Sequence, residues 1–411
     1  MKRWIALIAS IIMQTSLGMV YAWSTFVPAL EKEHGIDHGS AGMIFGLCIA
    51  TFTFSMIFGG MLLRKSGPRL TGTIGGILFL AGYLCGALSD GNGIIMFLGF
   101  GVIAGIGIGF AYVCPLTTGV LWFPDHKGLI TGLAVAGFGL GGVFFAKAGL
   151  HMLNAQIPVL NILEHIGILV GVTVVCCSMF LFVPARQDAE KSGERSKINL
   201  RKVIVRPEFQ ALFAQMFLGT FGGLLVIGNL KPIGLANSLS AETATRAVML
   251  FAVGNAAGRV LWGLWYDRFG KNVIIVCMLL LAIGGAMMGT LPGIGGFYSA
   301  TLITAFAFGG CFVMFAARVA DVFGLNRIGD IYPLIFLGYG IAGLAGSPIG
   351  GWMLHLTGVP LYPCLLVFVL AIAGGAISVF SIIRKDQKSE IISTLNNMEY
   401  VELNKENQCE Q

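Results

Sequence analysis

Apolar residues form twelve long runs along the chain, each close to the length that crosses a bilayer. A transmembrane helix needs about 20 such residues, whereas a barrel strand needs only about 10. Because lipid offers the backbone no hydrogen-bond partner, runs of this length should be helices. The pattern predicts an all-α membrane protein with twelve transmembrane helices, at residues 4–29, 41–63, 70–89, 94–121, 129–153, 160–183, 209–238, 243–266, 273–292, 297–324, 332–354 and 361–383.

The composition is that of a membrane protein. Only 11% of the 411 residues are charged, whereas soluble domains have about 25%. The nine cysteines are scattered without the spacing of metal ligands, so we expect no metal site. The sequence has no phosphate-binding loop, and no cluster of histidine, cysteine and carboxylate falls within the apolar runs. We therefore predict neither a cofactor nor an enzymatic activity.

Lysine and arginine gather on one side of the predicted spans. With the N-terminus inside, 20 of the 26 basic residues fall in cytoplasmic segments, and only Lys32 and Arg246 fall in outer loops. Positively charged loops resist translocation. We therefore predict cytoplasmic termini and a place in the plasma membrane of a bacterium or archaeon. The net charge of +6 then reflects membrane topology rather than nucleic-acid binding.

The longest polar interruption divides the spans six and six. It predicts an N-terminal bundle (1–183), a cytoplasmic linker (184–208), a C-terminal bundle (209–383) and a cytoplasmic tail (384–411).

An internal repeat supports this division. RKSGPR after the second span matches DRFGKN after the eighth, with Gly67 and Gly270 203 residues apart. GFGLGG from Gly137 matches GYGIAG from Gly338 at an offset of 201. Two parallel six-helix repeats can rock against each other around a site at the bilayer midplane, as a secondary transporter requires.

These features resemble the major facilitator superfamily over nearly the whole chain. Four further segments resemble the family of oxalate/formate antiporters and bacterial monocarboxylate (lactate) transporters. They are VYAWS from Val20, WFPDHKG from Trp122, the arginine of the eighth span and DVFGLN from Asp321. The resemblance implies transport of a small carboxylate by alternating access.

The chain departs from the family in one copy of the gating loop. The resemblance assigns this loop in the second half to Asp267, Arg268 and Gly270. The first copy has Arg64 where the family usually has an aspartate. We therefore expect loop-based gating to differ between the two halves.

The eighth span carries Arg259 inside an otherwise apolar stretch, GNAAGRVLWG. Asn255, Arg259, Trp262 and Tyr266 recur at helical spacing and share one face. A guanidinium at the bilayer centre costs about 2.5–3.5 kcal/mol, so Arg259 should face a wet cavity, and no acidic residue lies at its depth. It could grip a carboxylate with two parallel hydrogen bonds, or serve as a structural pin on backbone carbonyls. The family's substrate-binding arginine falls at this position.

Three polar side chains are candidates beside Arg259. Tyr112 matches a family position that lines the site, although residue type alone would equally suit a packed aromatic. Tyr21 is a similar candidate, and Asn255 could orient the guanidinium or bond the substrate directly. Related animal monocarboxylate transporters have an aspartate at the place of Asn255, implicated in proton coupling. Because asparagine cannot titrate, the proton carrier is left open.

The resemblance also bears on the charge of the substrate. Tyr339 stands where oxalate-type members have a second cation, so a dianion would lack its second clamp. One cation suits a monocarboxylate such as lactate, pyruvate or formate. We expect Phe138 and Phe308 to form apolar walls of the same cavity.

Two lysines lie in the outer halves of predicted spans, Lys147 in the fifth and Lys231 in the seventh. Either can snorkel to the membrane surface. Lys231 precedes the helix-bending Pro232, so it could instead attract anions at an outer vestibule.

The sequence therefore predicts a secondary transporter that moves a small monocarboxylate with a proton and works as a monomer in the lipid bilayer. One alternative is an oxalate/formate-like exchanger. Another is a membrane-embedded carboxylate sensor that signals through the linker or the tail.

Overall fold

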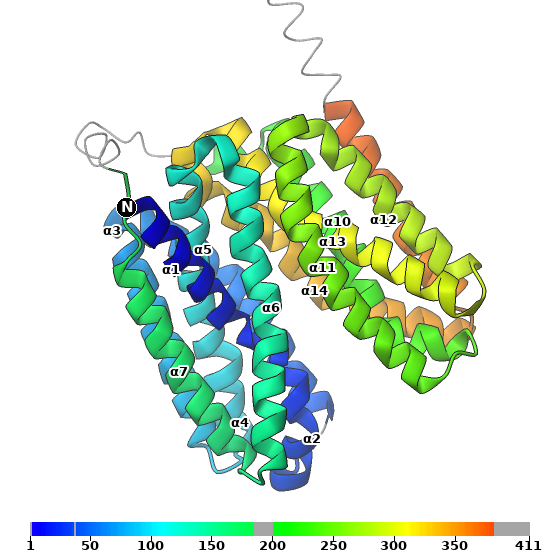
Figure 1. Cartoon of the computed structure of the whole chain (residues 1–411), viewed down its shortest axis with the longest axis horizontal. Coiled ribbons are helices and arrows are strands. Elements are labelled where there is room, and N and C mark those ends of the chain that lie inside the picture. Colours follow the sequence, from blue (N-terminus) through cyan, green and yellow to red (C-terminus); the bar gives the residue numbers. More distant parts are fainter. Residues whose placement is uncertain (1, 37, 185–199, 382–411) are drawn as a thin grey trace, which may run out of the picture.

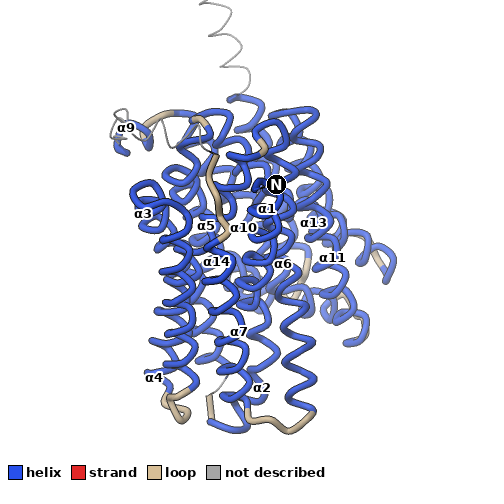
Figure 2. Tube along the Cα trace, turned by 60° about the vertical axis from the view of Figure 1, so that its left-hand side comes forward, coloured by secondary structure: helices blue, strands red, loops and turns tan. Residues whose placement is uncertain are grey.

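The computed structural model describes residues 2–36, 38–184 and 200–381. These residues form helices joined by short connections and include no strand (Figures 1 and 2). Most of the predicted linker, residues 185–199, and the whole predicted tail lie outside the described residues.

The N-terminal bundle contains the first six membrane crossings. Its elements are α1 (Lys2–Leu17), η1 (Gly18–Ala22), α2 (Trp23–His34), α3 (His38–Ala87), α4 (Gly93–Met96), η2 (Phe97–Ile103), α5 (Ala104–Trp122), η3 (Pro124–His126), α6 (Lys127–Asn154) and α7 (Val159–Met179).

The C-terminal bundle repeats this plan after a short helix, α9 (Leu200–Ile204). Its elements are α10 (Pro207–Ala236), α11 (Ala241–Phe269), η4 (Gly270–Asn272), α12 (Val273–Thr290), α13 (Gly293–Phe323), η5 (Leu325–Arg327), α14 (Ile328–Thr357) and a final helix, Leu361–Ser381.

Ten helical segments of the described chain are long and apolar enough to cross a membrane, and two of them are long enough to cross twice. Ser40–Ala87 has 48 residues and Ala241–Thr290 has 50. At about 1.5 Å per residue, each far exceeds the roughly 30 Å hydrocarbon core. Gly67 (φ 81°) bends the first and Gly270 (φ 65°) the second, because glycine adopts positive φ without steric cost. The predicted twelve crossings and the predicted repeat are confirmed.

The two six-helix bundles lie side by side (Figure 1), with α6 packed on α11 and α3 packed on α14. These two helix pairs are equivalent through the repeat. Small residues let the backbones approach: Gly128 and Gly263 lie so close that a Cβ on either would collide with the carbonyl oxygen of the other. The bundle interface is therefore a pair of closely packed helix crossings.

The two ends of the molecule differ. One end carries the start of α1, the bend at Gly67, the start of α6 and the end of α11, and we call it the basic end. In Figure 1 it is uppermost, and the two bundles separate toward the opposite end.

Candidate functional site

Arg259 lies on the inner face of α11, where this helix faces the N-terminal bundle. Arg259, Trp262 and Tyr266 are all at most 2% exposed, whereas Val253 and Leu261 on the other face are 65% and 40% exposed. This separation follows the helical spacing found in the sequence. The arginine is therefore directed to the interface between the bundles.

Three contacts hold the guanidinium of Arg259. Its Nη1 donates a hydrogen bond of 2.5 Å to the carbonyl oxygen of Val135 in α6. The ring of Phe312 lies 4.8 Å from the guanidinium carbon, a cation–π distance. A Cβ on Gly139 would lie 2.7 Å from Nη1, so only glycine leaves room for the side chain there. Elements of both bundles thus position one cation.

One edge of the guanidinium has no hydrogen-bond partner in the described part of the chain. Nε is buried without a hydrogen bond, and no hydrogen bond among the described residues uses Nη2. Arg259 also forms no ion pair with a described acidic residue. The Nε–Nη2 edge presents two parallel donors, the arrangement that binds a carboxylate bidentately.

The environment of Arg259 differs from the wet cavity expected from the sequence. Its side chain is 2% exposed and lies against the ring of Phe312, and the bond to Val135 is of the structural kind considered as an alternative. This burial excludes water and strengthens the interaction of the cation with any anion that reaches it.

Seven aromatic residues from both bundles form a cluster beside Arg259, which we call the aromatic cluster. Neighbouring ring centroids lie 5.0–6.3 Å apart, the range of favourable edge-to-face and offset pairs. The members are Tyr21 of η1, Phe52 of α3, Tyr112 of α5, Phe138 of α6, Phe312 of α13, and Phe336 and Tyr339 of α14.

A hydroxyl pair joins the two bundles within the aromatic cluster. The hydroxyls of Tyr21 and Tyr339 lie 3.0 Å apart. Tyr21 projects from the 3₁₀ turn that interrupts the first crossing, and its ring meets Phe138 edge-on at 5.3 Å. Any ligand that separates the bundles must break this bond.

The structure brings most of the predicted site residues together. Tyr112 packs edge-on against Phe138 at 5.1 Å, and Tyr339 packs at 5.1 Å against Phe312, the ring over the guanidinium of Arg259. Asn255 lies one helical turn from Arg259 and is half-buried, with an Oδ1 atom that is buried without a partner. Phe308 packs against Phe312, with centroids 5.1 Å apart, on the side of α10.

The two outer lysines lie elsewhere. Lys147 and Lys231 are exposed on α6 and α10, and neither makes a polar contact with another described residue. This placement suits the snorkelling interpretation.

Several residues of the site were not predicted from the sequence. Phe312 follows Phe308 by one turn, and Phe336 precedes Tyr339 by three residues, so helical spacing could have indicated both. Val135 contributes only a backbone carbonyl oxygen, for which the side-chain sequence carries no signal.

The predicted gating loop of the C-terminal bundle begins with a residue that caps a helix of the other bundle. Asp267 accepts hydrogen bonds from the backbone N–H groups of Gly128 (2.7 Å) and Leu129 (2.8 Å) at the start of α6. These N–H groups lack partners within the helix, and the helix dipole favours a negative charge there. Arg268 is exposed, and Gly270 supplies the turn.

Two ion pairs also join the bundles at the basic end. Arg64 lies 3.7 Å from Asp330 in the first turn of α14. Lys127 lies 2.5 Å from Asp321, which also accepts a hydrogen bond from Tyr266. The polar contacts that join the bundles thus extend from the basic end to the aromatic cluster.

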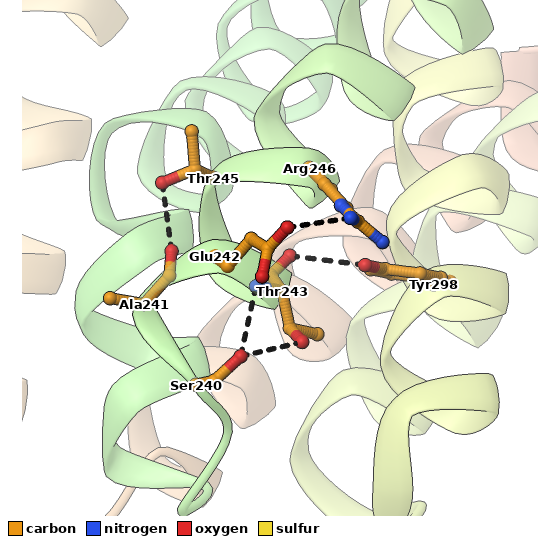
Figure 3. A network of polar contacts seen from close by, with 7 residues as sticks. All are labelled: Ser240, Ala241, Glu242, Thr243, Thr245, Arg246 and Tyr298. Carbon is orange, nitrogen blue, oxygen red and sulfur yellow. Dashed lines mark hydrogen bonds and ion pairs between the residues drawn. The ribbon is translucent and has the colours of Figure 1, made fainter.

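At the opposite end, polar contacts anchor α11 within its own bundle (Figure 3). Ser240 accepts a hydrogen bond from the N–H of Thr243, and Tyr298 of α13 donates to the carbonyl oxygen of Thr243. Arg246 binds Glu242 at 2.6 Å on the exposed surface. The start of α11 is therefore fixed to α13.

Comparison with known proteins identifies the family. The model of the Major Facilitator Superfamily matches residues 6–235 and 211–396. The chain belongs to this superfamily. The fold agrees with this family. A crystal structure of the superfamily transporter FucP in the outward conformation matches the structure of this chain with a TM-score of 0.72. That match covers 91% of this chain and 99% of FucP at 14% identity.

Relatives of this superfamily transporter include carboxylate carriers. The uncharacterised MFS-type transporter YhjX of Escherichia coli (strain K12) is 29% identical over 353 residues, covering 83% of this chain and 86% of YhjX. The oxalate:formate antiporter of Oxalobacter formigenes is 25% identical over 358 residues, covering 85% and 84%. Apicoplast pyruvate carrier 1 of Toxoplasma gondii is 27% identical over 356 residues, covering 70% and 64%.

Proposed function

We propose that this transporter carries a small monocarboxylate of the lactate, pyruvate or formate type by alternating access, together with a proton. The observation that supports this most directly is the Nε–Nη2 edge of Arg259, which forms no hydrogen bond with a described residue and whose Nε is buried. A carboxylate matches two parallel donors in shape and charge. The names of the antiporter and the pyruvate carrier among the relatives agree with a carboxylate substrate.

The single cation favours a monocarboxylate. Tyr339, rather than a second basic residue, packs on Phe312, the ring that lies over the guanidinium of Arg259. A dianion would bring a second negative charge among aromatic rings, where an unpaired charge is costly. One carboxylate on one guanidinium leaves no net charge in the site.

We assign the basic end to the cytoplasm of a bacterial or archaeal cell, because basic segments resist translocation. The polar contacts then close the cytoplasmic side, and the site is reached from outside. The change to the state that opens to the cytoplasm requires release of these contacts and of the Tyr21–Tyr339 bond.

Movement of a proton together with the anion has an energetic advantage. An anion that enters a cell with a negative interior opposes the membrane potential, at about 2.3 kcal/mol per 100 mV. A proton moving with the anion removes this cost. Since Asn255 cannot titrate, the proton travels on the substrate or on a group outside the Arg259 site.

The similarity to the oxalate:formate antiporter supports exchange as a second candidate mode. Exchange balances charge by moving one anion out for each anion in. In liposomes, exchange predicts that substrate on the far side accelerates uptake, whereas symport predicts that the outside becomes alkaline when substrate is added.

Purified protein in liposomes tests the proposal through pH-driven uptake of labelled lactate, pyruvate, formate and oxalate. We expect uptake of a monocarboxylate and a loss of at least about tenfold in Arg259→Lys, because lysine lacks the two-pronged edge. Arg246→Lys is the matched control, since Arg246 lies on the same helix and, among the described residues, pairs only with exposed Glu242 (Figure 3). Undiminished uptake by Arg259→Lys would contradict the proposal.

A further inference from the structure

A small cavity lies between the two bundles at the basic end, beside the ion pair of Arg64 and Asp330. Its volume is about 50 Å³, and a buried water molecule needs about 10–15 Å³. The space therefore admits a few water molecules or a group as small as a carboxylate. Its lining includes Leu63 and Arg64 of α3, Thr117 and Thr118 of α5, and Gly329 and Asp330 of α14.

Two hydroxyl groups of this cavity have no hydrogen-bond partner in the described part of the chain. Thr117 is 9% exposed and Thr118 is 1% exposed, and the Oγ1 atom of each is buried. Other buried threonines in helices, such as Thr53 and Thr71, donate to the carbonyl oxygen four residues earlier. Buried polar groups are nearly always hydrogen-bonded, so two unpaired hydroxyls that line one cavity indicate a ligand.

Glycine at position 329 keeps this space open. A Cβ on Gly329 would lie 3.5 Å from Oγ1 of Thr117 and 3.0 Å from Cδ2 of Leu63. The hydroxyl of Thr117 therefore faces α14 across the interface between the bundles. The cavity is shared between two bodies that move apart in alternating access, because α3 and α5 belong to one bundle and α14 to the other.

Separation of the bundles changes the charge of this site. Arg64, Thr117 and Thr118 stay together, since α3 and α5 pack closely within the N-terminal bundle. Asp330 leaves with α14, and the guanidinium of Arg64 loses that carboxylate. One cation and two hydroxyl donors are left side by side. Such donors form strong, charge-assisted hydrogen bonds with an anion.

We propose that Arg64, Thr117 and Thr118 form a second anion site, which binds a small carboxylate at the cytoplasmic face once Asp330 has moved away. The identity of this carboxylate as the transported substrate, and of the basic end as cytoplasmic, rests on the proposed function. The carboxylate of Asp330 lies beside Arg64 in the structure, so the group that replaces it has the same chemistry. A substrate on its way to the cytoplasm thus meets a second cation.

Binding at this site opposes closure of the basic end. The anion and Asp330 need the same guanidinium, so the anion stabilises the state in which the basic end is open. When the bundles close again, Asp330 displaces the anion toward the cytoplasm. An aspartate, which the related transporters usually have in place of Arg64, would repel an anion. The second site therefore follows from the departure of this chain at position 64.

Membrane vesicles of opposite orientation test the site, because inside-out vesicles expose the cytoplasmic face and right-side-out vesicles expose the outer face. The double variant Thr117→Val, Thr118→Val removes both hydroxyls at nearly constant shape. We expect its KM for labelled lactate to rise about tenfold at the cytoplasmic face, the effect of two lost hydrogen bonds. The KM at the outer face should stay within about twofold.

Two control variants separate the loss of the hydroxyls from a general loss of packing. Thr117→Ser combined with Thr118→Ser keeps both hydroxyls and should keep the wild-type KM at the cytoplasmic face. Thr304→Val removes a buried hydroxyl that also lacks a partner but faces α12 within the C-terminal bundle. This variant should change the KM at neither face.

Asp330→Asn tests the same site by the opposite change, and it is decisive even if the valine variant does not fold. The amide has the size of the carboxylate but not its charge, so it competes poorly for Arg64. The KM for lactate at the cytoplasmic face should then fall at least about threefold. A KM that stays at the wild-type value would overturn the competition between Asp330 and the anion.

Inorganic phosphate distinguishes a carboxylate site from a site for any oxyanion. Phosphate added at the cytoplasmic face should leave lactate transport by the wild type unchanged. Inhibition by phosphate that disappears in the double valine variant would overturn the assignment to a carboxylate.

The second site and the proposed function fail in different ways. An unchanged KM at the cytoplasmic face of the double valine variant, or an equal rise at both faces, would overturn the second site alone. Lactate uptake that survives Arg259→Lys in both kinds of vesicle would instead overturn the proposed function.

Discussion

Arg64 and Asp330 form an ion pair of 3.7 Å between the two bundles. Through the internal repeat, they correspond to Asp267 and Leu129, which meet at the start of α6. Arg64 alone would face the positive end of the α14 dipole, and Asp330 in the first turn offsets that repulsion. The departure from the family at Arg64 is thus accompanied by an acid on the opposing helix.

This correspondence predicts that the two changes compensate each other. Arg64→Asp alone places two carboxylates together at the start of α14 and should lower the unfolding temperature in detergent. Arg64→Asp combined with Asp330→Leu rebuilds the arrangement of Asp267 and should recover most of the loss. We expect a coupling free energy of about 1 kcal/mol from the double-mutant cycle, since Arg64 is partly exposed. Lys65→Asp is the exposed control, and additive effects of the two changes would contradict compensation.

Removal of the Asp267 carboxylate should loosen the start of α6. Asp267→Ala leaves the N–H groups of Gly128 and Leu129 without their acceptor, at a cost of about 1–2 kcal/mol. Hydrogen–deuterium exchange of residues 124–131 should therefore become about tenfold faster or more. Arg268→Ala, next in the chain and exposed, should leave exchange unchanged. Unaltered protection in Asp267→Ala would show that the cap does not hold this end closed.

A methyl group at Gly139 should displace the guanidinium of Arg259. The Cβ of alanine would lie 2.7 Å from Nη1 of Arg259, so the guanidinium must move away from Val135. We expect the KM for the carboxylate to rise about tenfold while the protein still folds, because misplacement of a binding group weakens both of its hydrogen bonds. Gly46→Ala is the matched control, as no atom lies within 4 Å of its Cβ position. An unchanged KM would argue against the observed position of Arg259 in substrate binding.

A second cation at position 339 should shift selectivity toward dicarboxylates. Tyr339→Lys places an ammonium group near Arg259 in the aromatic cluster, so oxalate should compete with labelled substrate at least about tenfold better than in the wild type. Tyr339→Met also loses the bond to Tyr21 but adds no charge, and it separates the two effects. Equal competition by oxalate in both variants would refute the role of the added positive charge in dicarboxylate selectivity.

The fold followed from the sequence because lipid imposes one rule on every span. Twelve apolar runs had to become helices, and Gly67 and Gly270 had to mark the tight connections within the two repeats. The helical face of Arg259 was equally predictable, since periodicity alone separates it from Val253 and Leu261.

Tertiary structure alone decided what surrounds that cation. Val135 offers its backbone carbonyl to Arg259, and Phe336 meets Phe52 and Tyr112, only because the two bundles dock. The partner of Arg64 also lies in the other bundle, 266 residues away along the chain. A sequence pattern records which face of a helix is buried, since that depends on local spacing. Which atoms meet across an interface depends on how two distant surfaces pack.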